Sequence, residues 1–86
     1  MGTLQTVRDY VVENFLFGDG SRLEDSTSFL QNGIIDSTGI LELTAFIEDT
    51  FGVRIEDHEL VPDNMDSLTS VAAFVARKLA VAGRAA

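Results

Sequence analysis

Residues 36–52 read Asp-Ser-Thr-Gly-Ile-Leu-Glu-Leu-Thr-Ala-Phe-Ile-Glu-Asp-Thr-Phe-Gly, and their apolar side chains recur at intervals of three and four. The residues that follow this spacing are Ile40, Leu43, Ile47 and Phe51. Such spacing gathers side chains on one face of an α-helix. Asp36 and Ser37 offer capping oxygens at the start, and Gly52 ends the pattern. The stretch therefore predicts an amphipathic helix with one buried face.

Two further helices are predicted on either side of this central one. The first covers Thr3 to Leu16, with Thr3 as its N-cap residue and apolar residues again three or four positions apart. The last begins behind Asp66 or Ser67, either of which can cap it. Its apolar positions are Leu68, Val71, Ala72, Val75 and Leu79. Both patterns predict apolar faces that are buried in a small helical bundle.

The segments between these helices are irregular. Residues 17–35 form a long polar connection, which we expect two apolar pairs to pin to the core. The pairs are Phe29 with Leu30 and Ile34 with Ile35. Residues 56–60 are expected to form one helical turn before Pro62. The predicted fold class is all-α: a small antiparallel bundle with three main helices, one short helix and a long first loop.

The chain of 86 residues is expected to be one domain, residues 1–86, because this length leaves no room for a second core. It carries 14 acidic residues against 6 lysines and arginines, for a net charge of −8. This charge argues against nucleic acid and anionic membranes, which attract clustered basic residues, and favours a basic protein surface as partner. No apolar run is long enough to span a membrane and residues 1–5 lack a signal-peptide layout, so a cytoplasmic location is expected.

Residues suited to catalysis or metal binding are few. The chain has no cysteine, which leaves neither a disulfide nor a thiolate metal site. Its one histidine, His58, stands among acidic residues without a nucleophile motif. Glycine-rich loops of the phosphate-binding type are also missing. We therefore expect no catalytic residue, no metal site and no enzyme activity.

Ser37 is the residue best placed for chemistry. A serine at the start of a helix lies beside unpaired N–H groups and the positive end of the helix dipole, which stabilise a phosphate by about 0.3–1 kcal/mol. Ser37 is therefore a good attachment point for a phosphodiester. Standing alone, the pair Asp36 and Ser37 would be interpreted as an ordinary helix cap.

Three blocks of sequence stand at distances shared with a known family. The blocks are Gly33-Ile34-Ile35-Asp36-Ser37, Phe51-Gly52-Val53-Arg54-Ile55 and Asn64-Met65-Asp66-Ser67-Leu68. They resemble the acyl carrier protein family, which includes peptidyl and aminoacyl carriers. The family has a Gly-x-x-Asp-Ser signature, a helix ending in Phe-Gly-Val-x-Ile, and a Ser-Leu element before its last helix. The resemblance spans about residues 7–79.

The resemblance implies an acyl-carrier-like four-helix fold and a specific function. Family members carry 4′-phosphopantetheine as a phosphodiester on the serine of the Asp-Ser pair, which is Ser37 here. A phosphopantetheinyl transferase loads this arm from coenzyme A, with Asp36 in the recognised motif. Substrates are bound as thioesters to the terminal thiol of the arm. This implies a stand-alone acyl or aminoacyl carrier of fatty acid, polyketide or nonribosomal peptide biosynthesis, whose working thiol belongs to the prosthetic group.

Partner enzymes are expected to bind the face of the central helix opposite its buried side. This predicted partner face consists of Thr38, Leu41 and Ala45, flanked by Glu42, Glu48 and Asp49. An apolar strip rimmed by acids suits transient docking of a monomeric carrier on basic patches of ligase or synthase enzymes. Leu41 carries most weight in this prediction, because it is apolar and lies away from the buried face.

Two positions depart from the family pattern, and two questions stay open. Many carriers have leucine after the serine where this chain has Thr38, which leaves open which enzymes recognise the helix. Gly39 in the first turn costs about 1 kcal/mol relative to alanine, so the helix start is expected to fray. The cargo stays open between a fatty acyl chain, an amino acid and a small aryl acid. The alternative function is an unmodified helical interaction module that uses the same acidic face.

Overall fold

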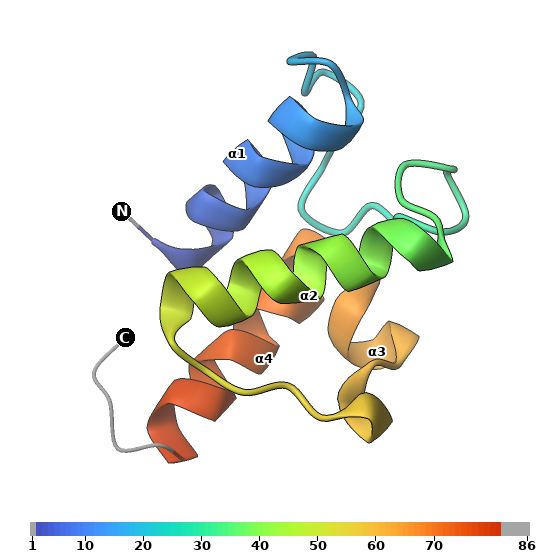
Figure 1. Ribbon diagram of the computed structural model, residues 1–86. Helices are drawn as coiled ribbons and strands as arrows, with labels where there is room; N and C mark the ends of the chain where they lie inside the picture. Colours follow the sequence, from blue (N-terminus) through green and yellow to red (C-terminus); the bar gives the residue numbers. More distant parts are fainter. Residues whose placement is uncertain (1, 82–86) are drawn as a thin grey trace.

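The computed structural model describes residues 2–81, and its regular elements are all helical (Figure 1). The helices are α1 (Thr3–Phe15), α2 (Ser37–Phe51), α3 (Pro62–Met65) and α4 (Leu68–Val81), with a 3₁₀ turn at Asp57–Glu59. No strand occurs in the part of the chain that is described. The predicted all-α class, with three main helices and a short one, is confirmed. None of the described helices is both long enough and apolar enough to cross a membrane.

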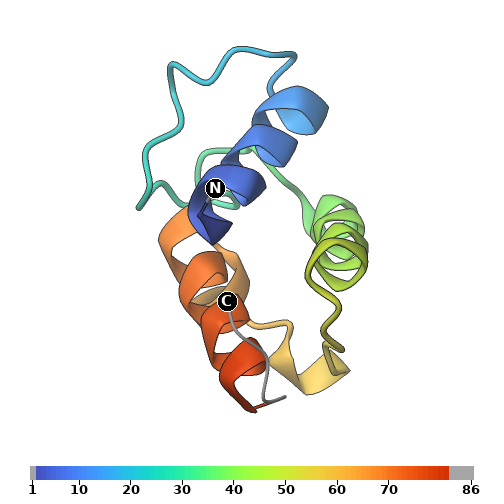
Figure 2. The same cartoon turned by 90° about the vertical axis from the view of Figure 1, so that its left-hand side faces the viewer.

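The helices enclose one core. α1 packs against α4, and α2 lies on the other side of the core, as the end-on view of α2 in Figure 2 shows. α3 packs against the start of α4. The largest fully buried side chains are Phe29, Ile35, Leu43, Ile47, Met65 and Leu68. They come from the long connection, α2, α3 and α4, and α1 adds the fully buried Val7 and Val11, so the connection and α3 belong to the core as much as the main helices do.

α1 begins and ends slightly differently from its prediction. Thr3 is the first helical residue and Gly2 occupies the N-cap position, so the prediction of Thr3 as the N-cap is wrong. The Gly2 carbonyl accepts hydrogen bonds from the amide and the hydroxyl of Thr6, both at 3.1 Å. At the other end the helix stops at Phe15, and Leu16 is the C-cap residue.

α2 has the two ends that its sequence predicts. A carboxylate oxygen of Asp36 accepts a hydrogen bond from the Gly39 amide at 2.7 Å. Gly52 ends the helix in the left-handed conformation, with φ of 68°. Of the predicted buried face, Leu43 and Ile47 are fully buried, and Ile40 and Phe51 are half-buried.

Gly39 lies in the first turn of α2 because the end of α1 leaves no space there for a side chain. A Cβ atom on Gly39 would lie 2.7 Å from the Cγ2 atom of Ile35 and 2.9 Å from the Cε1 atom of Phe15. Gly39 itself is buried. The missing side chain of Gly39 therefore permits the close approach of Ile35 and Phe15 to the first turn of α2.

The long connection between α1 and α2 is held at several points. Its buried apolar residues are Leu23, Phe29, Ile34 and Ile35. Leu30, which was predicted to pin the connection, is 45% exposed, so that part of the prediction is wrong. Arg8 of α1 donates a hydrogen bond to the Leu23 carbonyl at 2.7 Å and pairs with Asp25. The Thr69 amide of α4 donates to the Asp25 carbonyl at 2.9 Å, so the connection is fixed to two helices.

The chain between α2 and α4 holds two short turns where one was predicted. The 3₁₀ turn at Asp57–Glu59 falls within the predicted turn at 56–60, and α3 follows it, beginning with Pro62. Proline suits the first position of a helix, because an N–H there has no helical partner to lose. Ser67, one of the two predicted caps of the last helix, accepts a hydrogen bond from the Ser70 amide at 3.1 Å.

Candidate functional site

Ser37 is the first residue of α2, and it is exposed to solvent. The Gly39 amide donates to the Asp36 carboxylate, and the Ile40 amide donates to the Asp36 carbonyl at 2.9 Å. Among the described residues, no group accepts a hydrogen bond from the amide of Ser37 or of Thr38. An exposed hydroxyl thus lies next to two open N–H groups at the positive end of a helix.

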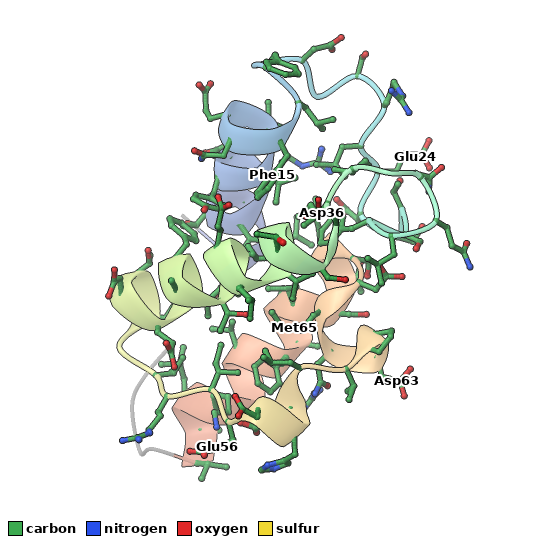
Figure 3. The ribbon with its side chains drawn as sticks, turned by 45° about the vertical axis from the view of Figure 1, so that its right-hand side comes forward. Phe15, Glu24, Asp36, Glu56, Asp63 and Met65 are labelled. Carbon is green, nitrogen blue, oxygen red and sulfur yellow. The ribbon has the colours of Figure 1, made fainter. Side chains whose placement is uncertain are left out.

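Asp36 fixes the direction in which the chain enters α2. Figure 3 labels Asp36 at the point where the long connection becomes helical. Its hydrogen bond to the Gly39 amide satisfies one of the otherwise open N–H groups of the first turn, which is worth about 1 kcal/mol for an N-cap residue. The Asp36 carboxylate therefore has a structural role in the free protein. A role in recognition by another enzyme would be additional to it.

A cleft of about 220 Å³ opens directly beside Ser37. Its walls come from three segments: the long connection, α2, and the chain that leads into and through α3. The lining residues are Leu30, Ser37, Ile40, Leu41, Leu60, Val61, Pro62, Met65 and Asp66. Most of them are apolar, and Leu30, Leu41 and Val61 are between 41% and 59% exposed at the surface. We call this space the Ser37 cleft.

Asp66 holds one wall of the Ser37 cleft in place. Its carboxylate accepts hydrogen bonds from the Ser28 hydroxyl and from the Leu30 amide, the latter at 2.9 Å, and its carbonyl accepts the Phe29 amide at 2.9 Å. Leu30 in turn lines the cleft. In the sequence Asp66 is a possible helix cap within the Asn64–Leu68 block, and its bonds to the connection could not be predicted, because its partners lie 36 to 38 positions earlier in the chain and no local pattern points to them.

Five of the six residues of the predicted partner face are exposed on α2. These are Thr38, Leu41, Glu42, Ala45 and Asp49. Their spacing along the helix places them on one side of it. The sixth, Glu48, is half-buried, and its carboxylate accepts a hydrogen bond from the Ile55 amide at 2.8 Å. Glu48 therefore ties α2 to the segment that follows it, and the exposed acids of the face are Glu42 and Asp49.

A larger and more open depression, of about 810 Å³, lies away from Ser37 at the far end of α2. It is mostly polar, and its walls include Glu48, Arg54 and His58. His58 does not line the Ser37 cleft. Within the described residues, no group of three or more histidines, aspartates or glutamates is arranged to hold a metal ion.

The chain was compared with family models, curated proteins and solved structures, and the last of these give a likeness. No family model and no curated protein matches the chain. Among solved structures, a similar chain belongs to a structure described as "Crystal structure of FAD-dependent dehydrogenase". The TM-score is 0.70 at 29% sequence identity, and the match covers 79% of this chain and 96% of that chain. The matched chain is thus shorter than this one, and the likeness extends over most of the helical bundle.

Proposed function

We propose that this protein is a stand-alone acyl or aminoacyl carrier, which holds 4′-phosphopantetheine on Ser37 and presents thioester-bound intermediates to partner enzymes. The observation that carries the proposal is the surroundings of Ser37. Its hydroxyl is exposed at the start of α2, beside two open N–H groups, and on the rim of an apolar cleft. The resemblance of the sequence around Asp36 and Ser37 to the acyl carrier family indicates that the attached group is 4′-phosphopantetheine.

The residues present fit a phosphodiester on Ser37. The open amides of Ser37 and Thr38 and the positive end of α2 would stabilise its negative charge. Asp36 does not compete for these two amides, because its carboxylate bonds the amide of Gly39. The apolar walls of the Ser37 cleft offer a surface to the parts of the group that carry no charge. Charge and polarity therefore both match the proposed modification.

In the loading step, the Ser37 hydroxyl oxygen would form a bond to the phosphorus of coenzyme A that bears the pantetheine portion. The pyrophosphate bond would break, adenosine bisphosphate would leave, and a base of the transferase would take the hydroxyl proton. Asp36 would keep the first turn of α2 formed while this occurs. When bound, the arm supplies the terminal thiol to which acyl groups attach, which a chain without cysteine cannot supply itself.

The proposed partners follow from charge and from the structural likeness. Glu42 and Asp49 on α2 favour enzymes with basic docking patches, such as the transferase and acyl or aminoacyl ligases and synthases. The likeness to a chain from a flavin-dependent dehydrogenase structure suggests such a dehydrogenase as one further class of partner. The protein would act as a monomeric carrier rather than as a catalyst, in the cytoplasm.

The proposal predicts that Ser37 alone is modified. Incubation with coenzyme A and each of several phosphopantetheinyl transferases should raise the intact mass of the wild type by one phosphopantetheine group. The Ser37→Ala variant should stay unmodified and keep its Tm, because the side chain is exposed. Ser26→Ala, which removes another exposed serine, serves as the matched control and should be modified normally. If no transferase modifies the wild type, the proposed modification is wrong, and the alternative function of an unmodified helical interaction module is favoured.

A second prediction separates the two roles of Asp36. Asp36→Ala should lower the free energy of unfolding by about 1 kcal/mol through loss of the cap. Asp36→Asn should keep most of that stability, because asparagine also caps helices, yet it removes the charge that belongs to the recognised motif. We therefore expect Asp36→Asn to melt close to wild type and to be modified more slowly. Equal rates for Asp36→Asn and wild type would show that capping is the whole role of Asp36.

A further inference from the structure

The chain between α2 and α3 crosses the surface without a buried side chain. Val53 and Met65 are buried, at 9% and 2% exposure, and none of residues 54–64 between them is buried. In Figure 1 this part of the chain runs from the end of α2 into α3. Segments with few buried apolar contacts open at a lower free energy than the core around them. We call residues 54–61 the strap.

The strap forms one wall of the Ser37 cleft. Its residues Leu60 and Val61 line the cleft, which α2 lines as well. The Ile55 amide of the strap donates to the Glu48 carboxylate of α2 at 2.8 Å. Glu48, however, lies about 16 Å along the helix from Ser37, because each helical residue adds 1.5 Å. This bond therefore does not hold the two walls together beside Ser37.

The strap is also bonded to α4. The Lys78 ammonium donates to the Glu59 carboxylate at 2.9 Å, and the two side chains are only 24% and 20% exposed. The same carboxylate oxygen accepts a hydrogen bond from the Glu56 amide at 2.9 Å. The Glu56 amide and, next to it, Lys78 lower the pKa of Glu59, so this carboxylate is charged at neutral pH. One carboxylate thus shapes the turn and joins it to α4.

Asn64 makes a second link from the same turn to α4. Its side-chain nitrogen donates to the Glu59 carbonyl at 2.9 Å, and its side-chain oxygen accepts a hydrogen bond from Arg77 at 3.0 Å. Arg77 and Lys78 lie 5.8 and 5.9 Å from the centroid of the Phe74 ring, which is buried. Both cations are therefore held against a fixed part of α4. We call the pairs Glu59–Lys78 and Asn64–Arg77 the α4 latch.

The two ends of the strap suit a change of direction. Gly52 precedes it with φ of 68°, and Pro62 follows it as the first residue of α3. A hinge needs only a few such residues to absorb a change in backbone angles. Between these ends the strap is held by the α4 latch, by the bond to Glu48, and by the half-buried Ile55 and Leu60. Loss of the latch would therefore free the strap while the packed helices stay formed.

A group attached to Ser37 would begin on the rim of the cleft that the strap borders. The Ser37 cleft measures about 220 Å³ with the strap latched, and most of its lining is apolar. A group on a short tether has a millimolar effective concentration at a neighbouring surface, so weak apolar contacts suffice for occupancy. Outward movement of the strap would enlarge the cleft directly beside the point of attachment. The arm on Ser37 is therefore the occupant that the geometry favours.

We propose that the strap is a movable wall of the Ser37 cleft, that the α4 latch holds it in place, and that its release lets the arm settle between α2 and the strap. The identity of the arm rests on the proposed function, whereas the latch is a property of the unmodified chain. With the latch closed, the arm extends into solvent, where partner enzymes reach it. The equilibrium between the two positions of the strap would thus set how often the arm is accessible.

Hydrogen exchange of the unmodified chain tests the latch. Lys78→Met keeps a side chain of similar length and removes the charge that holds Glu59. It should speed exchange of the Leu60 and Met65 amides, whose hydrogen bonds are made to carbonyls of the strap, by about fivefold or more. The Leu43 amide within α2 should exchange as in the wild type. An equal increase at Leu43 and Leu60, or no increase at Leu60, would overturn the inference.

Two further variants separate the latch from the loss of any positive charge. Arg77→Met breaks the other link of the latch and should speed exchange at Leu60 as Lys78→Met does. Arg54→Met is the matched control, because Arg54 pairs with Glu56 inside the strap and not with α4. Its Leu60 amide should exchange at the wild-type rate. A similar acceleration in Arg54→Met would overturn the inference, since any charge change in this region would then loosen the strap.

The position of the arm is followed in the modified protein. After loading from coenzyme A, nuclear Overhauser effects between the methyl groups of the arm and those of Leu60 and Val61 should be about twofold stronger or more in Lys78→Met than in the wild type. Unchanged effects would overturn the inference, because the strap would then move without admitting the arm. If no transferase modifies the wild type, the proposed function fails instead, and exchange in the unmodified chain still decides whether the latch holds the strap.

Discussion

Replacing Gly39 with alanine will lower the free energy of unfolding by about 1 kcal/mol and the Tm by about 4–8 °C. Helix propensity alone predicts the opposite sign, a gain of about 1 kcal/mol. The added Cβ atom, however, would lie 2.7 Å from Ile35 and 2.9 Å from Phe15, closer than carbon atoms can approach. Overpacking of this kind costs about 1–3 kcal/mol and outweighs the propensity.

The reason for the loss can be tested in a double-mutant cycle. Phe15→Leu shortens the side chain that meets Gly39 and destabilises the protein by itself. In that background Gly39→Ala should cost less than it does in the wild type, because part of the crowding is gone. Urea denaturation of the four proteins gives the coupling energy. An increase in Tm on Gly39→Ala alone would show that α1 does not press on the first turn of α2.

Replacing Asp66 with alanine will lower the free energy of unfolding by about 2–3 kcal/mol. The half-buried Asp66 carboxylate accepts two hydrogen bonds, from the Ser28 hydroxyl and the Leu30 amide. Hydrogen bonds to a charged group contribute about 1.5–3 kcal/mol, and the groups left behind lose their partner. The midpoint of urea denaturation reports the change.

Two further variants test whether the loss of stability in Asp66→Ala comes from the lost hydrogen bonds. Asp63→Ala removes an exposed acid three residues earlier and should change stability by no more than about 0.5 kcal/mol. Asp66→Asn keeps an acceptor oxygen and should lose less than Asp66→Ala. If Asp63→Ala and Asp66→Ala were equally harmful, general charge effects rather than the bonds to the long connection would account for the loss.

The main helices could be predicted because their signals are local. The apolar spacing of α2, the Asp36 cap and the left-handed Gly52 all lie within one stretch of sequence, and the structure confirms them. Pro62 was a usable signal for α3, since proline favours the first position of a helix, but a single turn leaves no periodic pattern. The prediction therefore stopped at the one turn before it.

The features that depend on distant residues could not be predicted. The Ser37 cleft is built from three segments, so no single stretch of sequence describes it. Glu48 has the position of a surface acid on a helical wheel, yet its carboxylate is used by the Ile55 amide. The crowding at Gly39 could not be predicted for the same reason, because propensity is a property of one helix and the contact with Phe15 belongs to two. The exposed position of Ser37 at the start of α2 could be predicted, because its signal lies in its immediate neighbours.

The close contact between α1 and the first turn of α2 also governs how α2 can move. Near its start, α2 has a cap and a buried glycine, followed by buried side chains at Leu43 and Ile47. Near its end, Asp49 and Thr50 are exposed. The open amides of Ser37 and Thr38 should exchange with solvent first, and among the hydrogen-bonded amides of α2 those at its far end should exchange sooner than those of Gly39 and Leu43. An arm attached to Ser37 would swing from a fixed pivot, and its reach would depend on its own length rather than on motion of the helix.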